Sequence, residues 1–149
     1  MKIYNIFFSP TGTSEKIAGA VAREISSALN VAIDNVDVTT ASHGDIIADD
    51  DDIVILVAPV YGGHMAPIAK TRMGMISGRG TNCILIAVYG NRAFEQALVD
   101  MSDFAGAHGL KPVAAGAFVG EHSYSTSETP IAVGRPDGND MKVLSLIHI

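Results

Sequence analysis

The chain has 149 residues, of which 48% are hydrophobic and 17% charged; this composition suits a compact domain with a sizeable core and excludes extensive disorder. Its formal net charge of −6 disfavours nucleic acids and anionic membranes as partners, because both are bound through positive surfaces. The single cysteine, Cys83, excludes an internal disulfide, and neither a secretory signal nor a long apolar span is evident. We therefore expect a single domain over residues 1–149 in a reducing cytoplasm.

Apolar runs alternate with helix-periodic segments along the chain, which predicts an α/β fold with a parallel sheet buried on both faces. Strands are expected at residues 2–8, 31–38, 53–58, 82–89 and 113–119. Helices are expected at residues 14–29, 66–76 and 93–108. This pattern predicts a doubly wound, three-layer sandwich.

Single residues support several of these elements. In the first helix, Ile17, Val21, Ile25 and Ala28 recur at helical spacing and would face the sheet. Gly109 would end the third helix. Proline cannot donate a ladder hydrogen bond, so the proline at position 112 suits a strand start.

The turn between the first strand and the first helix is rich in hydroxyl groups. The first turn of a helix leaves backbone N–H groups without partners and carries partial positive charge, so it favours a bound phosphate. Ser9, Thr11, Thr13 and Ser14 can each donate to phosphate oxygens, and Gly12 lets the backbone approach closely. The lysine of a Walker loop and the spaced glycines of a dinucleotide fingerprint are missing. The alternative is an ordinary helix start capped by Thr13 or Ser14.

The third strand is followed by Pro59, Val60, Tyr61, Gly62 and Gly63, before a helix starts. In a doubly wound sheet, ligands bind outside the carboxyl ends of the strands, where this loop would face the hydroxyl-rich turn. Tyr61 would then cover a flat ring. The alternative is a flexible turn whose aromatic side chain packs on the helix.

The fourth strand leads into Tyr89, Gly90, Asn91, Arg92 and Phe94. Tyr89 or Phe94 can stack on a flat ring, and Gly90 permits close backbone approach. Asn91 can bond to the edge of such a ring, and Arg92 can offset negative charge there. The alternative is a strand-end tyrosine followed by a helix that Asn91 caps.

The first turn resembles the phosphate loop of flavodoxins, Ser/Thr-x-Thr-Gly-x-Thr, with Ser14 in place of the usual threonine. Residues 1–142 as a whole are similar to the flavodoxin-like half of flavodoxin–ferredoxin fusion proteins. The resemblance rests on Pro-Val-Tyr-Gly-Gly at 59–63, Tyr-Gly-Asn-Arg at 89–92, Gly-Glu-His-Ser-Tyr-Ser at 120–125 and Arg-Pro-Asp at 135–137. It implies a flavodoxin-like fold with strand order 2-1-3-4-5 and flavin mononucleotide (FMN) as cofactor, held by the three loops. It further implies that the Gly62-Gly63 peptide can flip to offer a hydrogen bond to flavin N5 when N5 is protonated.

The chain departs from these fusion proteins in two respects. It lacks the cysteine cluster of an iron–sulfur centre, so any electron acceptor must be another molecule. The tail from Met141 to the end could begin a closing helix, but it is too short to cover the sheet. If the chain is a shortened form of such a fusion, an incomplete last helix would expose part of one sheet face. Self-association as a homodimer would then be expected.

We predict an FMN-binding electron-transfer protein that serves a redox partner of ferredoxin or reductase type, with no catalytic side chain and no metal. Because the protein is acidic, the potential for the final electron should be low. Two alternatives stay open at this point. One is an FMN-dependent NAD(P)H:quinone-type reductase, and the other is a flavodoxin-fold interaction module without cofactor.

Three further features invite functional interpretations that we do not favour. The four aspartates at 49–52 are expected to form a solvated turn, because adjacent carboxylates on an extended chain do not converge on one ion. His122 is expected in a loop that lines the flavin edge or caps a turn, because no hydrolase nucleophile elbow accompanies it. Cys83 is expected in the core.

Overall fold

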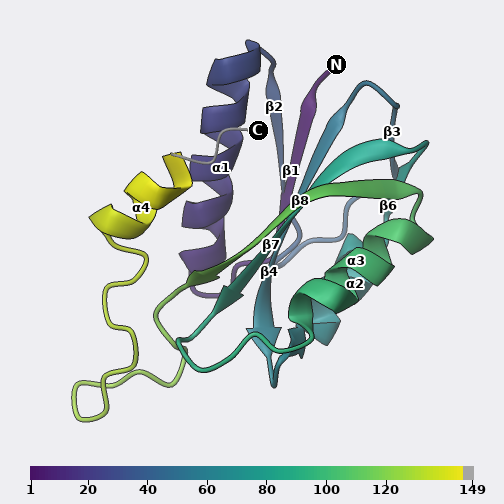
Figure 1. Cartoon of the computed structure of the whole chain (residues 1–149). Helices are drawn as coiled ribbons and strands as arrows, with labels where there is room; N and C mark the ends of the chain where they lie inside the picture. The colour runs from purple at the N-terminus through teal and green to yellow at the C-terminus, as the bar shows by residue number, and fades with distance from the viewer. Residues whose placement is uncertain (146–149) are drawn as a thin grey trace.

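The computed structural model describes the backbone of residues 1–145 and shows a parallel sheet with helices on both faces (Figure 1). The five long strands are β1 (Ile3–Phe7), β2 (Ile33–Asp37), β4 (Ile53–Tyr61), β7 (Thr81–Tyr89) and β8 (Leu110–Val119). They lie in the order β2-β1-β4-β7-β8, and each neighbouring pair is parallel. The predicted fold class and strand order are thus confirmed.

The central strands are buried on both faces, as the continuous apolar runs predict. Every residue of β1 is buried, and so is most of β4 and β7. The one polar residue in β1, Asn5, is fully buried and donates from Nδ2 to Oδ1 of Asn35 on β2 at 2.8 Å. The two sheet edges are β2 and β8.

Two helices cover each face of the sheet (Figure 1). On one face, α1 (Thr13–Leu29) packs on β1 and β4, and α4 (Gly138–Ser145) lies against α1. On the other face lie α2 (Pro67–Met73) and α3 (Ala97–Ala107). Ile17, Val21 and Ile25 of α1 are buried as expected, whereas Ala28 is exposed because α1 ends one residue later, beyond the sheet.

Two helices are shorter than predicted. The chain leaves α2 at Gly74 and then forms a short strand, β6 (Ile76–Gly78), which pairs with β3 (Ile46–Ala48) outside the main sheet. The start of α3 is delayed to Ala97, because Asn91 and Glu95 both adopt positive φ and so interrupt a helix. Three-residue strands carry too little periodicity to be found in the sequence.

Strand β8 starts earlier than predicted, and Pro112 lies inside it. The register with β7 shifts between Cys83 and Ile84, opposite Pro112, and β8 is an edge strand. A bulge on an edge is a place where a strand accommodates proline without losing an interior ladder bond. Gly109, with φ of 71°, follows α3 as predicted.

The acidic run forms the turn before β4, and only part of it is solvated. Residues 49–51 are exposed, but Asp52 is buried and accepts hydrogen bonds from the Lys2 and Asp49 amides at 2.8 and 3.0 Å. Asp51 pairs with the N-terminal amine at 2.9 Å. The expectation of a wholly solvated turn was therefore wrong for Asp52, which ties the start of β1 to the turn.

The predicted closing helix is α4, and it begins three residues before Met141, which packs against the core under α1. On that face of β8, Ala114 and Phe118 are only half-buried. The last part of the tail, residues 146–149, lies outside the described residues.

Candidate functional site

The carboxyl ends of β1, β4, β7 and β8 meet at a cavity of about 460 Å³, a size typical of small-molecule and cofactor sites. The lining residues come from four segments, one at the carboxyl end of each of these strands. They are Pro10, Thr11, Thr13, Ser14, Pro59, Val60, Tyr61, Gly62, Val88, Tyr89, Gly90, Gly120, Glu121, His122, Ser123 and Tyr124. The site therefore lies where the switch-point rule places it.

The predicted phosphate cradle forms one end of this cavity. Gly12 precedes α1 with φ of 80°, a left-handed conformation that favours glycine. No side chain caps the helix at that position, so capping by Thr13 or Ser14 was wrong. Instead, Oγ of Ser9 accepts a hydrogen bond from the Glu15 amide at 2.9 Å.

This arrangement reserves other donors for a ligand. Lys16 N–H donates to the carbonyl of Gly12 at 3.1 Å, and the Glu15 amide is taken by Ser9. The amides of Thr13 and Ser14 belong to the first turn, which has no intrahelical acceptor. Their hydroxyls and that of Thr11 line the cavity beside them. An anion would be held by amides and hydroxyls here, since none of the lining residues is a lysine or arginine.

The second predicted loop is a tight hairpin rather than a flexible turn. Strand β4 continues through Pro59, Val60 and Tyr61 and pairs antiparallel with β5 (His64–Met65). The two turn residues, Gly62 and Gly63, have φ of 60° and 83°, as a two-residue hairpin turn of the primed type requires. Gly62 lines the cavity, whereas Gly63 is buried behind it and accepts a hydrogen bond from the Gln96 amide at 2.8 Å.

The third predicted loop contributes only its first two residues to the cavity, Tyr89 and Gly90. Phe94 packs edge-on against the Tyr89 ring, with ring centroids 5.4 Å apart, but is not among the lining residues. Asn91 and Arg92 are exposed outside the cavity lining, and Asn91 caps no helix because α3 starts at Ala97. Capping by Asn91 was wrong, and the ligand roles of Asn91, Arg92 and Phe94 stay predictions.

A fourth wall, residues 120–124 after β8, was not among the predicted site residues. Gly120 lies against Thr13 and Val88, so a Cβ at this position would collide with both side chains. His122 lines the cavity, in agreement with one of the two places expected for it, a loop that lines the ligand site. The signal for this wall was the Gly-Glu-His-Ser-Tyr-Ser motif, in which only His122 had an expected place.

Two tyrosines face the cavity from different walls. Tyr61 and Tyr124 are 45% and 79% exposed, enough for each to cover a ligand ring from the rim. Partial burial and the neighbouring Tyr124 raise the pKa of Tyr61 above its ordinary value, so this phenol stays neutral and can donate a hydrogen bond.

His122 and Glu121 are the titratable residues of the fourth wall besides Tyr124. Nδ1 of His122 accepts a hydrogen bond from the Tyr124 amide at 3.0 Å. In the neutral imidazole the proton then resides on Nε2, which makes this ring a hydrogen-bond donor. The Glu121 carboxylate accepts a hydrogen bond from the Gly134 amide at 3.0 Å.

These features suit a phosphorylated ligand with a flat ring. One end of the cavity offers an anion cradle of amides and hydroxyls without a lysine or arginine, and the other end has walls lined by aromatic residues and glycines. A family model described as "Flavodoxin domain" matches residues 5–127. The chain belongs to this flavodoxin family. A search of curated proteins gave no match.

Solved structures agree with the flavodoxin assignment at the level of the fold. Oxidised flavodoxin 1 from Bacillus cereus aligns with a TM-score of 0.69 at 17% identity, over 97% of this chain and 92% of that one. Flavodoxin from Streptococcus pneumoniae TIGR4 gives a TM-score of 0.62 at 17% identity, over 97% and 93% of the two chains. An azoreductase from Bacillus anthracis gives a TM-score of 0.57 at 11% identity, over 80% of this chain and 87% of that one. The fold is thus shared by proteins described as flavodoxins and by one described as an azoreductase.

Within the part of the chain that the structure describes, no group of three or more acidic, histidine or cysteine side chains could hold a metal ion. None of the described helices is long and apolar enough to cross a membrane.

Proposed function

We propose that this flavodoxin-domain protein binds FMN without a covalent bond and transfers electrons to or from a protein partner. The supporting observation is the cradle at the start of α1, which joins three hydroxyl side chains and two first-turn amides to a cavity walled by tyrosines. In this proposal FMN supplies the redox chemistry. The chain's own residues bind the phosphate, cover the ring and set the electrostatic environment.

Each wall has a separate task in this proposal. Thr11, Thr13 and Ser14 hold the phosphate, and Tyr61 covers the ring from the hairpin. The turn at Gly62 brings backbone amide and carbonyl groups close to the ring, because no side chain intervenes. The rigid hairpin fixes this peptide, since Gly63 is hydrogen-bonded to the start of α3.

The electrostatics of the site favour a low reduction potential. Glu121 is the charged side chain among the lining residues, no lysine or arginine lines the cavity, and the whole chain carries a net charge of −6. Adding negative charge to a ring in such a site is disfavoured. We expect a potential for the final electron below that of free FMN, and a partner with a basic docking surface.

One observation favours a second candidate, an FMN-dependent reductase of a quinone-type acceptor. His122 lines the cavity, and its Nε2–H can donate a hydrogen bond to an acceptor oxygen that gains negative charge on reduction. Steady NAD(P)H oxidation by the FMN-loaded protein in the presence of a quinone would support this candidate. An electron carrier would show turnover only when its partner proteins are added.

The proposal is tested by titrating the flavin-stripped protein with FMN and following the quenching of flavin fluorescence. Thr11→Asp places a carboxylate in the cradle, and Thr11→Asn is the matched neutral control. We expect one-to-one binding by the wild type, a loss of at least about tenfold in Thr11→Asp and a smaller change in Thr11→Asn. Riboflavin, which has no phosphate, should not distinguish the two variants. A folded wild type that binds no FMN would reject the proposal in favour of the interaction module.

A further inference from the structure

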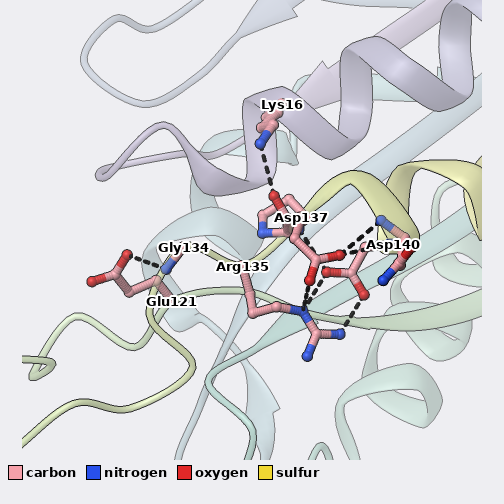
Figure 2. A network of polar contacts seen from close by, with 8 residues as sticks. Lys16, Glu121, Gly134, Arg135, Asp137 and Asp140 are labelled. Carbon is pink, nitrogen blue, oxygen red and sulfur yellow. Dashed lines mark hydrogen bonds and ion pairs between the residues drawn. The ribbon is translucent and has the colours of Figure 1, made fainter.

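The segment after β8 runs as a long loop from the cavity to α4 and carries the Arg135-Pro136-Asp137 motif (Figure 1). This motif has no direct role in the proposed function. None of its three residues lines the cavity. The side chains around it nevertheless form one connected polar network, which Figure 2 shows.

The network joins the motif to the start of α4. The Arg135 guanidinium forms a two-point contact with the Asp140 carboxylate, through Nε and one terminal nitrogen. Paired contacts of this kind fix geometry as well as contributing energy. Asp140 also accepts a hydrogen bond from the Asp137 amide at 2.7 Å, and Asp137 accepts from the Asn139 amide at 2.8 Å. Arg135 is therefore held from the α4 side.

The same motif holds the fourth wall of the cavity. The carbonyl of Arg135 accepts a hydrogen bond from the Glu121 amide at 2.9 Å, and the Glu121 carboxylate accepts one from the Gly134 amide. The neighbouring His122 amide donates to the carbonyl of Ile131 at 3.1 Å. Two segments of the loop, 120–122 and 131–135, are thus tied together directly beside the cavity.

The network also reaches the helix that carries the phosphate cradle. Nζ of Lys16, in the first turn of α1, donates to the carbonyl of Pro136 at 2.7 Å (Figure 2). At the other end of the loop, Gly120 sits on the Thr13 methyl group, where a Cβ would not fit. The loop therefore contacts the start of α1 at both of its ends, 16 residues apart in sequence.

We infer that Lys16, Arg135 and Asp140 form a latch that fixes the 120–124 wall relative to the phosphate cradle, so that one ligand is gripped at its anionic end and at its ring by a single rigid unit. These three are positioning residues, since none of them touches the cavity. The inference that the gripped ligand is a flavin nucleotide rests on the proposed function, whereas the fixed position of the wall does not.

The latch predicts a local effect in the protein without flavin. Arg135→Met removes the guanidinium at similar side-chain length, and Lys16→Met removes the contact to Pro136. Lys70→Met is the matched control, because Lys70 is exposed on α2, on the opposite face of the sheet. Amide hydrogen exchange is measured by NMR in the flavin-free full chain for Glu121, His122 and Gly134, with Ile86 in the buried strand β7 as reference.

In both latch variants we expect exchange at Glu121, His122 and Gly134 to accelerate by roughly tenfold or more, the factor that corresponds to losing one charge-assisted hydrogen bond. Exchange at Ile86 should be unchanged, and Lys70→Met should match the wild type at all four amides. Unchanged exchange at the three wall amides would overturn the latch. Equal acceleration at Ile86 would also overturn it, because the residues would then support only global stability.

A second measurement connects the latch to the ligand. If FMN binds, both latch variants should weaken the binding of FMN and of riboflavin by a similar factor. The reason is that the 120–124 wall is displaced while the cradle hydroxyls stay in place. A loss confined to FMN in Arg135→Met would contradict a role in ring positioning. If no flavin binds at all, the exchange experiment still decides whether the latch exists, so the two proposals fail separately.

Discussion

The imidazole of His122 lies directly on Gly90, so closely that a Cβ on Gly90 would overlap the ring. The two residues belong to different walls of the cavity, one after β7 and the other after β8. The absence of a side chain at Gly90 is therefore what allows the fourth wall to close onto the third.

This contact predicts that Gly90→Ala displaces His122 from the cavity and weakens flavin binding by about tenfold, since the ring, rather than a flexible chain end, must move. The test is a double-mutant cycle with His122→Ala, read by flavin titration. Once His122 is truncated, adding the methyl group at Gly90 should cost little. Additive losses would show that the two walls do not depend on each other.

The hairpin offers a pair of neighbouring glycines in different surroundings. Gly62 has open space where a Cβ would lie, whereas a Cβ on Gly63 would meet the Glu95 side chain. Both have positive φ, so Gly62→Ala should cost about 1 kcal/mol of unfolding free energy from backbone strain alone. Gly63→Ala should cost only a little more, because the carboxylate end of the exposed Glu95 side chain can rotate away and only the Glu95 Cβ, at 3.0 Å, must give slightly. Urea unfolding of the flavin-free proteins measures both values, and a cost above about 3 kcal/mol for Gly63→Ala would contradict this expectation.

Cys83 should be inert in the folded protein. It lies in β7 with no exposed surface, and burial raises the pKa of its thiol to about 12. Because the thiolate is the reactive form, iodoacetamide at pH 8 should label the native protein very slowly and the urea-unfolded protein rapidly. Rapid labelling of the native protein would show that β7 opens readily, which a central strand should not do.

The Arg135–Asp140 contact predicts a dependence on pH. The hydrogen bonds that Asp140 accepts from the Arg135 guanidinium lower the pKa of the Asp140 carboxyl below its ordinary value. A carboxyl whose pKa is lower in the folded state stabilises the fold at any pH above its unfolded-state pKa, which is about 3.9. This stabilisation is lost as the pH falls through the folded-state pKa. The stability difference between wild type and Arg135→Met should therefore be largest above about pH 4 and shrink towards pH 2. Urea unfolding across this range measures it, and a constant difference would exclude Asp140 ionisation as its source.

The sequence predicted the sheet well because burial on both faces forces a simple pattern. The apolar runs of β1, β4 and β7 have few alternatives, and the loops that follow parallel strands must meet at one edge. Thr11, Thr13, Ser14, Tyr61, Gly62, Tyr89 and Gly90 could be placed at the cavity on that basis.

What the sequence did not predict depends on contacts between distant segments. The delayed start of α3 follows from two positive φ values and from the bond between Gln96 and the hairpin, neither of which has a periodic signal. The fourth wall is placed by Gly120 against Thr13 and by the contact of Lys16 with Pro136, whose partners lie 107 and 120 residues apart in the chain. A motif such as Arg-Pro-Asp gives no hint in sequence that its carbonyl groups, as well as its charged side chains, hold distant segments together.

The most direct test of the central claim is to map FMN onto the flavin-stripped, 15N-labelled chain by amide chemical shifts. We predict the largest changes at Thr13 and Ser14 in the cradle, Gly62 in the hairpin, Gly90 after β7 and His122 in the fourth wall. Riboflavin should shift the last three amides but not the first two. Changes concentrated elsewhere, or none at saturating FMN, would contradict the assignment of this cavity as a flavin nucleotide site.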